Sequence, residues 1–236
     1  MRAGLTFLLL LTACARPQSN LAKPQPPETI VLWAWDRAED LRFLKPGEAE
    51  VAALMRTLYL RNGNVEQWRR KLPLLLPEGV QPIEVTRFES DGSTLPATSA
   101  VVDHFFYEVH SEPRRLQFDF DVRASQIPWY LELLEQTKTW KSTVSITSIV
   151  SNCLENPWSA DLPIEVVPML FRMGPQRGTY LAKLQTKGAF ANGCRGSLGI
   201  STDEPLAWRP PAKRIYVFNP NRWTRESFDQ IRSRLR

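Results

Sequence analysis

The stretch at residues 116–141, LQFDFDVRASQIPWYLELLEQTKTWK, combines the pattern of one β-strand with that of one α-helix. Apolar and polar residues alternate strictly over 116–121, which is typical of a strand. Residues 125–141 are expected to be a helix with Ser125 as its N-cap. The same alternation continues on both sides. Further strands are expected at 29–35, 83–88, 143–148, 165–171, 197–201 and 214–218, and further helices at 98–109, 176–187 and 224–235.

These seven main strands, separated mostly by helices, predict a parallel α/β fold. The length suits an irregular (β/α) barrel of the TIM type. Its irregularities are an inserted β-hairpin at 57–68 around Asn62 and Gly63, and a segment at 203–213 without a helical pattern. A further short helix is expected at 48–55. Pro168 places its strand at an edge or a bulge. An open doubly wound sheet is the alternative, but no glycine-rich phosphate turn follows any strand.

The first 28 residues lie outside this pattern. Met1 and Arg2 precede a short apolar run, and residues 11–14, LTAC, resemble a bacterial lipobox. This predicts a signal peptide at 1–13, lipidation of Cys14, a proline-rich tether at 14–28 and a single domain at 29–236. Because Ala15 follows the cysteine, the resemblance implies a lipid anchor in the outer membrane, with the domain facing the periplasm. A plain signal peptide with an incidental cysteine is the alternative.

The other two cysteines fit an oxidising compartment. Cys153 and Cys194 form an even pair, for which a disulfide is expected there. The alternative is two free, buried thiols.

Composition and motifs exclude several classes of protein. The chain is 43% hydrophobic and 23% charged, an ordinary globular balance. Its net charge of +5 is dispersed, which disfavours nucleic-acid binding. Two histidines, His104 and His110, do not make a metal site, and no nucleotide motif is present. We therefore expect neither a metal nor a cofactor.

The candidate site lies where strands end. Gln117, Asp119 and Asp121 share one face of their strand, and in a barrel that face points inward. Two inward carboxylates are costly, and such pairs cluster at active sites. The alternative is a scaffold in which Arg87 or Arg172 neutralises them. Candidate second acids are Glu89 and Glu204. Candidate substrate-binding residues, chosen because aromatic and polar groups grip sugar rings, are Trp35, Asp36, Arg87, Arg172, Asp203, Asn219 and Trp223.

Several segments together resemble the bacterial domain-of-unknown-function family DUF3142. They are VLWAWDRAEDLRFL (31–44), LQFDFDVRASQIPWYLELL (116–134), SITSIVSNCL (145–154), VPMLFRMG (167–174) and CRGSLGISTDEP (194–205). The resemblance implies a bacterial envelope protein with a barrel like those of glycoside hydrolases. Asp119 and Asp121 are similar to a shortened chitinase-type D-x-D-x-E signature, although Arg123 stands where that signature has glutamate.

These features favour a lipid-anchored, glycosidase-like barrel that acts on or holds an envelope glycan. Asp119 and Asp121 would be its acidic centre, with one of them kept protonated. The first alternative is a non-catalytic carbohydrate-binding lipoprotein on a degenerate barrel, which Arg123 favours. The second is a structural envelope partner that uses its basic C-terminal helix. Whether the protein is an enzyme stays open from the sequence.

Overall fold

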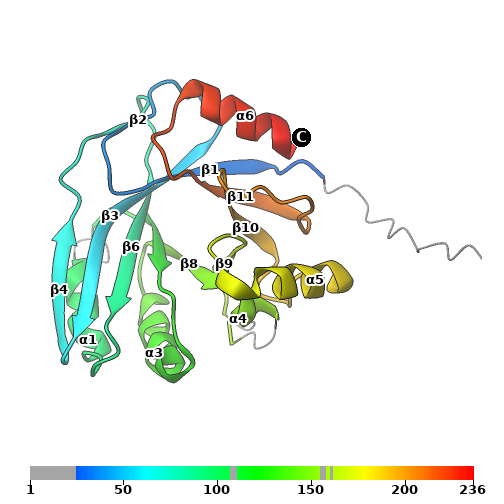
Figure 1. The fold of residues 1–236 in the computed structure, drawn as a ribbon. Coiled ribbons are helices and arrows are strands. Elements are labelled where there is room, and N and C mark those ends of the chain that lie inside the picture. The colour runs from blue at the N-terminus through cyan, green and yellow to red at the C-terminus, as the bar shows by residue number, and fades with distance from the viewer. Residues whose placement is uncertain (1–24, 107–110, 155–157, 160–161) are drawn as a thin grey trace, which may run out of the picture.

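The protein is an irregular TIM-type barrel in a computed structural model that describes residues 25–106, 111–154, 158–159 and 162–236 (Figure 1). Within these residues, eight parallel strands form the barrel, and β1 closes it by pairing with both β11 and β3. The strands are β1 (Thr29–Ala34), β3 (Glu50–Arg61), β6 (Ile83–Ser90), β7 (Arg115–Asp119), β8 (Thr143–Ile149), β9 (Glu165–Met169), β10 (Gly196–Ser201) and β11 (Ala212–Phe218).

The predicted hairpin is present, but its first arm belongs to the barrel. Strand β4 (Asn64–Arg69) pairs antiparallel with the second half of β3. Asn62 and Gly63 join them with φ of 48° and 75°, the left-handed conformation that a two-residue hairpin turn requires. The helix expected at 48–55 was wrong. Residues 51–54 are buried on both faces of β3, so an all-apolar run occupies a strand that neighbours cover on both sides.

Helices cover the barrel unevenly (Figure 1). The main ones are α3 (Ile127–Thr137), α5 (Arg177–Lys187) and α6 (Arg225–Leu235), with shorter turns at α1 (Thr98–Val102), η1 (Asp103–Phe105), η2 (Ala124–Gln126), α4 (Val150–Leu154) and η3 (Gly174–Gln176). Ser125 lies inside η2 and is not an N-cap. The fully described connections β1–β3 and β10–β11 contain no helix, as expected for 203–213. The first of these instead contains β2 (Glu39–Asp40), which pairs with β5 (Leu74–Leu75). The expected helix at 98–109 extends partly outside the described residues.

The strands bury side chains on both of their faces. The larger apolar cluster lies between barrel and helices and includes Phe118 and Phe120, as their period-two spacing predicts. A smaller cluster, which includes Trp33 and Tyr216, lies inside the barrel. Near the N-terminal ends of the strands, Arg214 forms ion pairs with Glu50 and Glu165, and these pairs lie at the floor of the barrel.

The disulfide between Cys153 and Cys194 is present, with a Cα–Cα distance of 5.7 Å. It joins α4 to the segment before β10, and both cysteines are fully buried. The link spans a weak part of the barrel, because β9 and β10 are paired only through Met169 and Gly199 in the described sheet. Pro168 lies beside that single pair, and in a closed barrel its strand is not an edge.

The described chain begins and ends at the same place. Arg209 donates to the carbonyl of Gln25 at 3.2 Å and to that of Leu235 at 3.5 Å. The end of α6 therefore lies beside the segment that leads into β1 (Figure 1). Phe228, Ile231 and Leu235 of α6 are buried against the barrel. Arg225 and Arg232 on that helix both form ion pairs with Glu48.

Candidate functional site

A cavity of about 630 Å³ opens at the end of the barrel where the strands finish. It is lined by residues near or just beyond the C-terminal ends of β1, β7, β8, β9 and β11 and by residues from the middle of β6. Active sites of TIM barrels lie at this end, because the loops that follow the strands can vary without disturbing the core. This cavity is therefore the candidate site.

Asp119, the last residue of β7, is the buried acid of the cavity. Asp119 is only 7% exposed to solvent, and it lines the cavity. Thr147 Oγ1 donates to Asp119 Oδ1 at 2.7 Å, and Arg87 Nη1 donates to Oδ2 at 3.2 Å. Burial raises the pKa of Asp119, and the positive charge of Arg87 and the hydroxyl of Thr147 oppose that rise. Both carboxyl oxygens therefore have protein partners.

Arg87 links the acids of two neighbouring strands. Its Nε lies 2.8 Å from Glu89 Oε1, and its guanidinium lies 5.5 Å from the centre of the Trp35 ring. Burial alone lowers the pKa of Arg87, but the charges of Asp119 and Glu89 outweigh it and raise the pKa. The neutralisation of an inward acid by Arg87, which was the alternative to a functional pair of acids, is present at Asp119. Glu89, a candidate second acid, is engaged with Arg87 and does not line the cavity.

Asp121 lies two residues beyond Asp119 on the same side and also lines the cavity. It is exposed, and it has no hydrogen bond or ion pair with any residue in the described part of the chain. Its charge contributes to the pKa of both Asp119 and Arg87. The structure thus brings the two predicted acids together, one buried and partnered, the other open to a ligand.

Aromatic rings form the apolar wall. Phe171 and Phe218 stack at 5.5 Å with nearly parallel planes, Trp35 meets Phe218 edge-on at 5.9 Å, and Trp33 lies 6.0 Å from Phe171. Trp33 Nε1 donates to Gln117 Oε1 at 2.7 Å, which orients both side chains. The sequence indicated Trp35 but missed Phe171 and Phe218. The period-two spacing of Tyr216 with Phe218, and of Met169 with Phe171, was the available signal.

Arg172 lies at the rim, where β9 ends, and lines the cavity. It has φ of 53°, an uncommon conformation for a residue other than glycine. Arg172 Nη2 lies 2.8 Å from Asp203 Oδ2, and Nη1 pairs with Glu204. These hydrogen bonds raise the pKa of Arg172. Asp203 and Glu204 are thus tied to Arg172, and neither lines the cavity.

Besides Glu89, Asp203 and Glu204, three more predicted site residues do not line the cavity. Trp223, in the segment after β11, is buried, and its Nε1 donates to the carbonyl of Trp33 at 2.9 Å. Asn219 is also buried, and its Oδ1 accepts from Thr202 Oγ1 at 3.0 Å. Asp36 is exposed and is not among the lining residues. Trp223 and Asn219 organise the loop that follows β11, so their contacts are with the protein itself.

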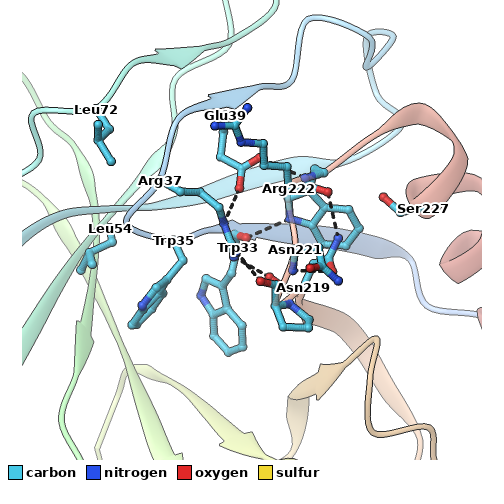
Figure 2. A network of polar contacts seen from close by, with 12 residues as sticks. Trp33, Trp35, Arg37, Glu39, Leu54, Leu72, Asn219, Asn221, Arg222 and Ser227 are labelled. Atoms are coloured by element: carbon cyan, nitrogen blue, oxygen red, sulfur yellow. Dashed lines mark hydrogen bonds and ion pairs between the residues drawn. The ribbon is translucent and has the colours of Figure 1, made fainter.

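A network of arginines holds the loop after β1 (Figure 2). Arg37 donates to the carbonyl of Asn219 at 2.6 Å and pairs with the buried Glu39 at 2.8 Å. Arg70 donates to the carbonyl of Trp35 at 2.5 Å and to that of Arg37. Because no helix follows β1, these bonds fix the backbone that carries Trp35. Sequence reasoning gave no role to Arg37 or Arg70.

Comparison with known proteins gave no match among family models, curated proteins or solved structures. The resemblance to DUF3142 therefore rests on the sequence segments alone. Among the described residues, no group of three or more His, Cys, Asp or Glu side chains could hold a metal ion. No helix within the described ranges is long and apolar enough to cross a bilayer.

Proposed function

We propose that this protein binds a glycan in the cavity at the C-terminal end of the barrel. The supporting observation is the wall itself, in which Trp35 and Phe218 present aromatic surface beside the carboxyls of Asp119 and Asp121. A sugar has an apolar ring face and hydroxyl groups at its edge. Aromatic stacking and carboxylate hydrogen bonds satisfy these two features together. The volume of about 630 Å³ is in the range of small-molecule sites.

Hydrolysis of that glycan is the second candidate. The raised pKa of Asp119 favours it, because a glycosidase needs one protonated acid beside a second, ionised carboxylate. Asp121 would be the second carboxylate. Binding without turnover remains the first proposal for two reasons. Both oxygens of Asp119 already have partners. Arg123, at the position of the chitinase-type glutamate, does not line the cavity, and its Nη1 approaches Gly92.

Calorimetric titration with a panel of envelope oligosaccharides tests the binding proposal. The full chain is kept in a polyoxyethylene detergent, which carries no sugar that could compete. Trp35→Ala is expected to weaken binding at least about fivefold, the equivalent of about 1 kcal/mol for a lost aromatic contact. Trp68→Ala is the matched control, because Trp68 lies on the hairpin strand β4 outside the cavity. Equal losses in both variants would contradict the assignment of the cavity.

The same samples separate binding from hydrolysis. New reducing ends released by the wild type, and abolished in Asp119→Asn and Asp121→Asn with binding retained, would establish a glycosidase. Binding of a glycan without any release would identify a carbohydrate-binding protein.

We also propose that Cys14 carries lipid and anchors the barrel in the bacterial envelope. The lipobox-like segment and the Cys153–Cys194 disulfide support this location, because disulfides persist in oxidising compartments. Mass spectrometry of the mature N-terminus tests it. An acyl mass on Cys14, lost with membrane association in Cys14→Ser, is expected. An unmodified Cys14 in the wild type would refute the anchor.

A further inference from the structure

We infer that the cavity selects glycans with free amino groups, so that the ligand is a positively charged amino sugar. This inference rests on the proposed glycan binding and adds the charge of the ligand to it. It is drawn from how the charges on the cavity wall are paired.

Both arginines of the wall are already neutralised within the protein. Arg87 pairs with Asp119 at 3.2 Å and with Glu89 at 2.8 Å. Arg172 pairs with Asp203 at 2.8 Å and with Glu204. An anionic sugar could bind either guanidinium only by displacing an acid, so neither arginine offers a ready site for a carboxylate or phosphate ligand.

Asp121 is the remaining charge on the described wall. It lines the cavity, has no ion pair in the described part of the chain, and lies close enough to Asp119 and Arg87 for its charge to act on both. Residues that line the cavity or pair with its arginines include five acids and two arginines, and a third arginine, Arg177, lies 3.6 Å from one of these acids, Glu204. The local field is therefore negative, and it attracts a cation and repels an anion.

The aromatic wall contributes stacking, and Asp121 contributes the charge interaction. A cation is stabilised over the face of a tryptophan, but Arg87 already occupies this position at 5.5 Å from Trp35, so Asp121 remains the group that recognises a charged ligand. A protonated amine on a sugar can lie near Asp121 while the ring stacks on the aromatic side chains. A ring of the same shape whose nitrogen is acetylated keeps the stacking but loses the charge interaction.

The test compares three oligosaccharides of equal length: one of glucosamine, one of N-acetylglucosamine and one of galacturonic acid. Calorimetric titrations use the full chain in the sugar-free detergent, at a mildly acidic pH that protonates the amines and at low ionic strength. The glucosamine oligomer is expected to bind about tenfold more tightly than the N-acetylated one, as for a single charge pair in a solvated site. The galacturonic acid oligomer is expected to bind most weakly.

Asp121→Asn is the diagnostic variant, and Asp103→Asn is the matched control. Asp103 is an exposed acid on the outer layer and does not line the cavity. The preference for the glucosamine oligomer is expected to fall to about twofold or less in Asp121→Asn and to persist in Asp103→Asn. Added salt is expected to reduce the wild-type preference.

Each result leads to a separate conclusion. Equal or tighter binding of the N-acetylated oligomer by the wild type would overturn the charge selectivity and leave glycan binding intact. A preference retained in Asp121→Asn would overturn the role of Asp121. A lack of binding by all three oligomers would overturn the proposed function, and this inference with it.

Discussion

Loss of the Cys153–Cys194 disulfide is expected to destabilise the barrel. The size of the loss in unfolding free energy follows from the number of residues in the loop that the disulfide closes. The two cysteines are 41 residues apart. For a loop of that length, the chain-entropy relation gives a stabilisation of about 4 kcal/mol at 25 °C. The closed loop contains β9 and α5, and β9 has only one residue pair with β10 in the described sheet. The covalent link therefore restrains the part of the barrel where strand pairing is weakest.

Urea denaturation of the oxidised and reduced forms measures the contribution of the disulfide to the free energy of unfolding. Cys14→Ser removes the third cysteine, and reduction is carried out in denaturant before refolding, because both cysteines are fully buried. Reduced wild type keeps the thiols in place, so the comparison does not introduce a cavity. A loss of about 4 kcal/mol corresponds to a melting temperature lower by about 8–16 °C for a domain of this size.

The Cys153→Ala/Cys194→Ala double variant provides a second measurement. It is expected to lose at least as much stability as the reduced protein, because two buried sulfurs are also removed. A difference below about 1 kcal/mol between oxidised and reduced protein, with unchanged denaturant slopes, would refute the reasoning. It would show that the unfolded loop is already restrained without the disulfide.

Three further predictions concern single positions. Burial raises the pKa of Asp119, so its contribution to stability is present below the unfolded pKa of about 4 and is lost as the pH rises through the folded pKa. Melting temperatures should therefore shift in favour of Asp119→Asn, relative to wild type, between about pH 4 and pH 7, and a constant difference would contradict the burial effect. Gly63→Ala should lower the free energy of unfolding, measured in urea, by about 1–2 kcal/mol, because the φ of Gly63 is 75°. Its control, Gly178→Ala in α5, should be neutral or stabilising, because a Cβ there meets nothing within 4 Å. Thr224→Ala should lose about 1 kcal/mol of stability, because it removes the N-cap hydrogen bond from the Ser227 amide to Thr224 Oγ1. Thr224→Asp should retain stability, and equal melting temperatures for the two variants would refute the cap.

The sequence predicted most of the barrel because most of its strands alternate with helices. Strand β3 was the exception. Its first half, Glu50 to Met55, contains two alanines and no turn residue, and this pattern also suits a helix. Only the closure of the barrel, which pairs β3 with both β1 and β6, decides between the two. Local propensity does not contain that information.

The acids of the site were predictable, and their surroundings were only partly so. The strict alternation in β7 placed Asp119 and Asp121 inward, and Arg87, Trp35 and Arg172 also line the cavity. Phe171 and Phe218 were missed because strands covered on both faces do not reveal which apolar residues point inward. Trp223 and Asn219 were misplaced because a position after a strand does not state whether a side chain turns to the cavity or to its own loop.

The hydrogen bonds from Arg209 to the carbonyls of Gln25 and Leu235 bear on how the molecule would meet its ligand. They hold the start of the described chain at the floor of the barrel, opposite the cavity mouth. Eleven residues, 14–24, can extend over about 40 Å at most. With lipid on Cys14, the tether would join the barrel at its floor. The cavity mouth would then be the end of the barrel farthest from the point of attachment, where it is open to ligands in the aqueous space.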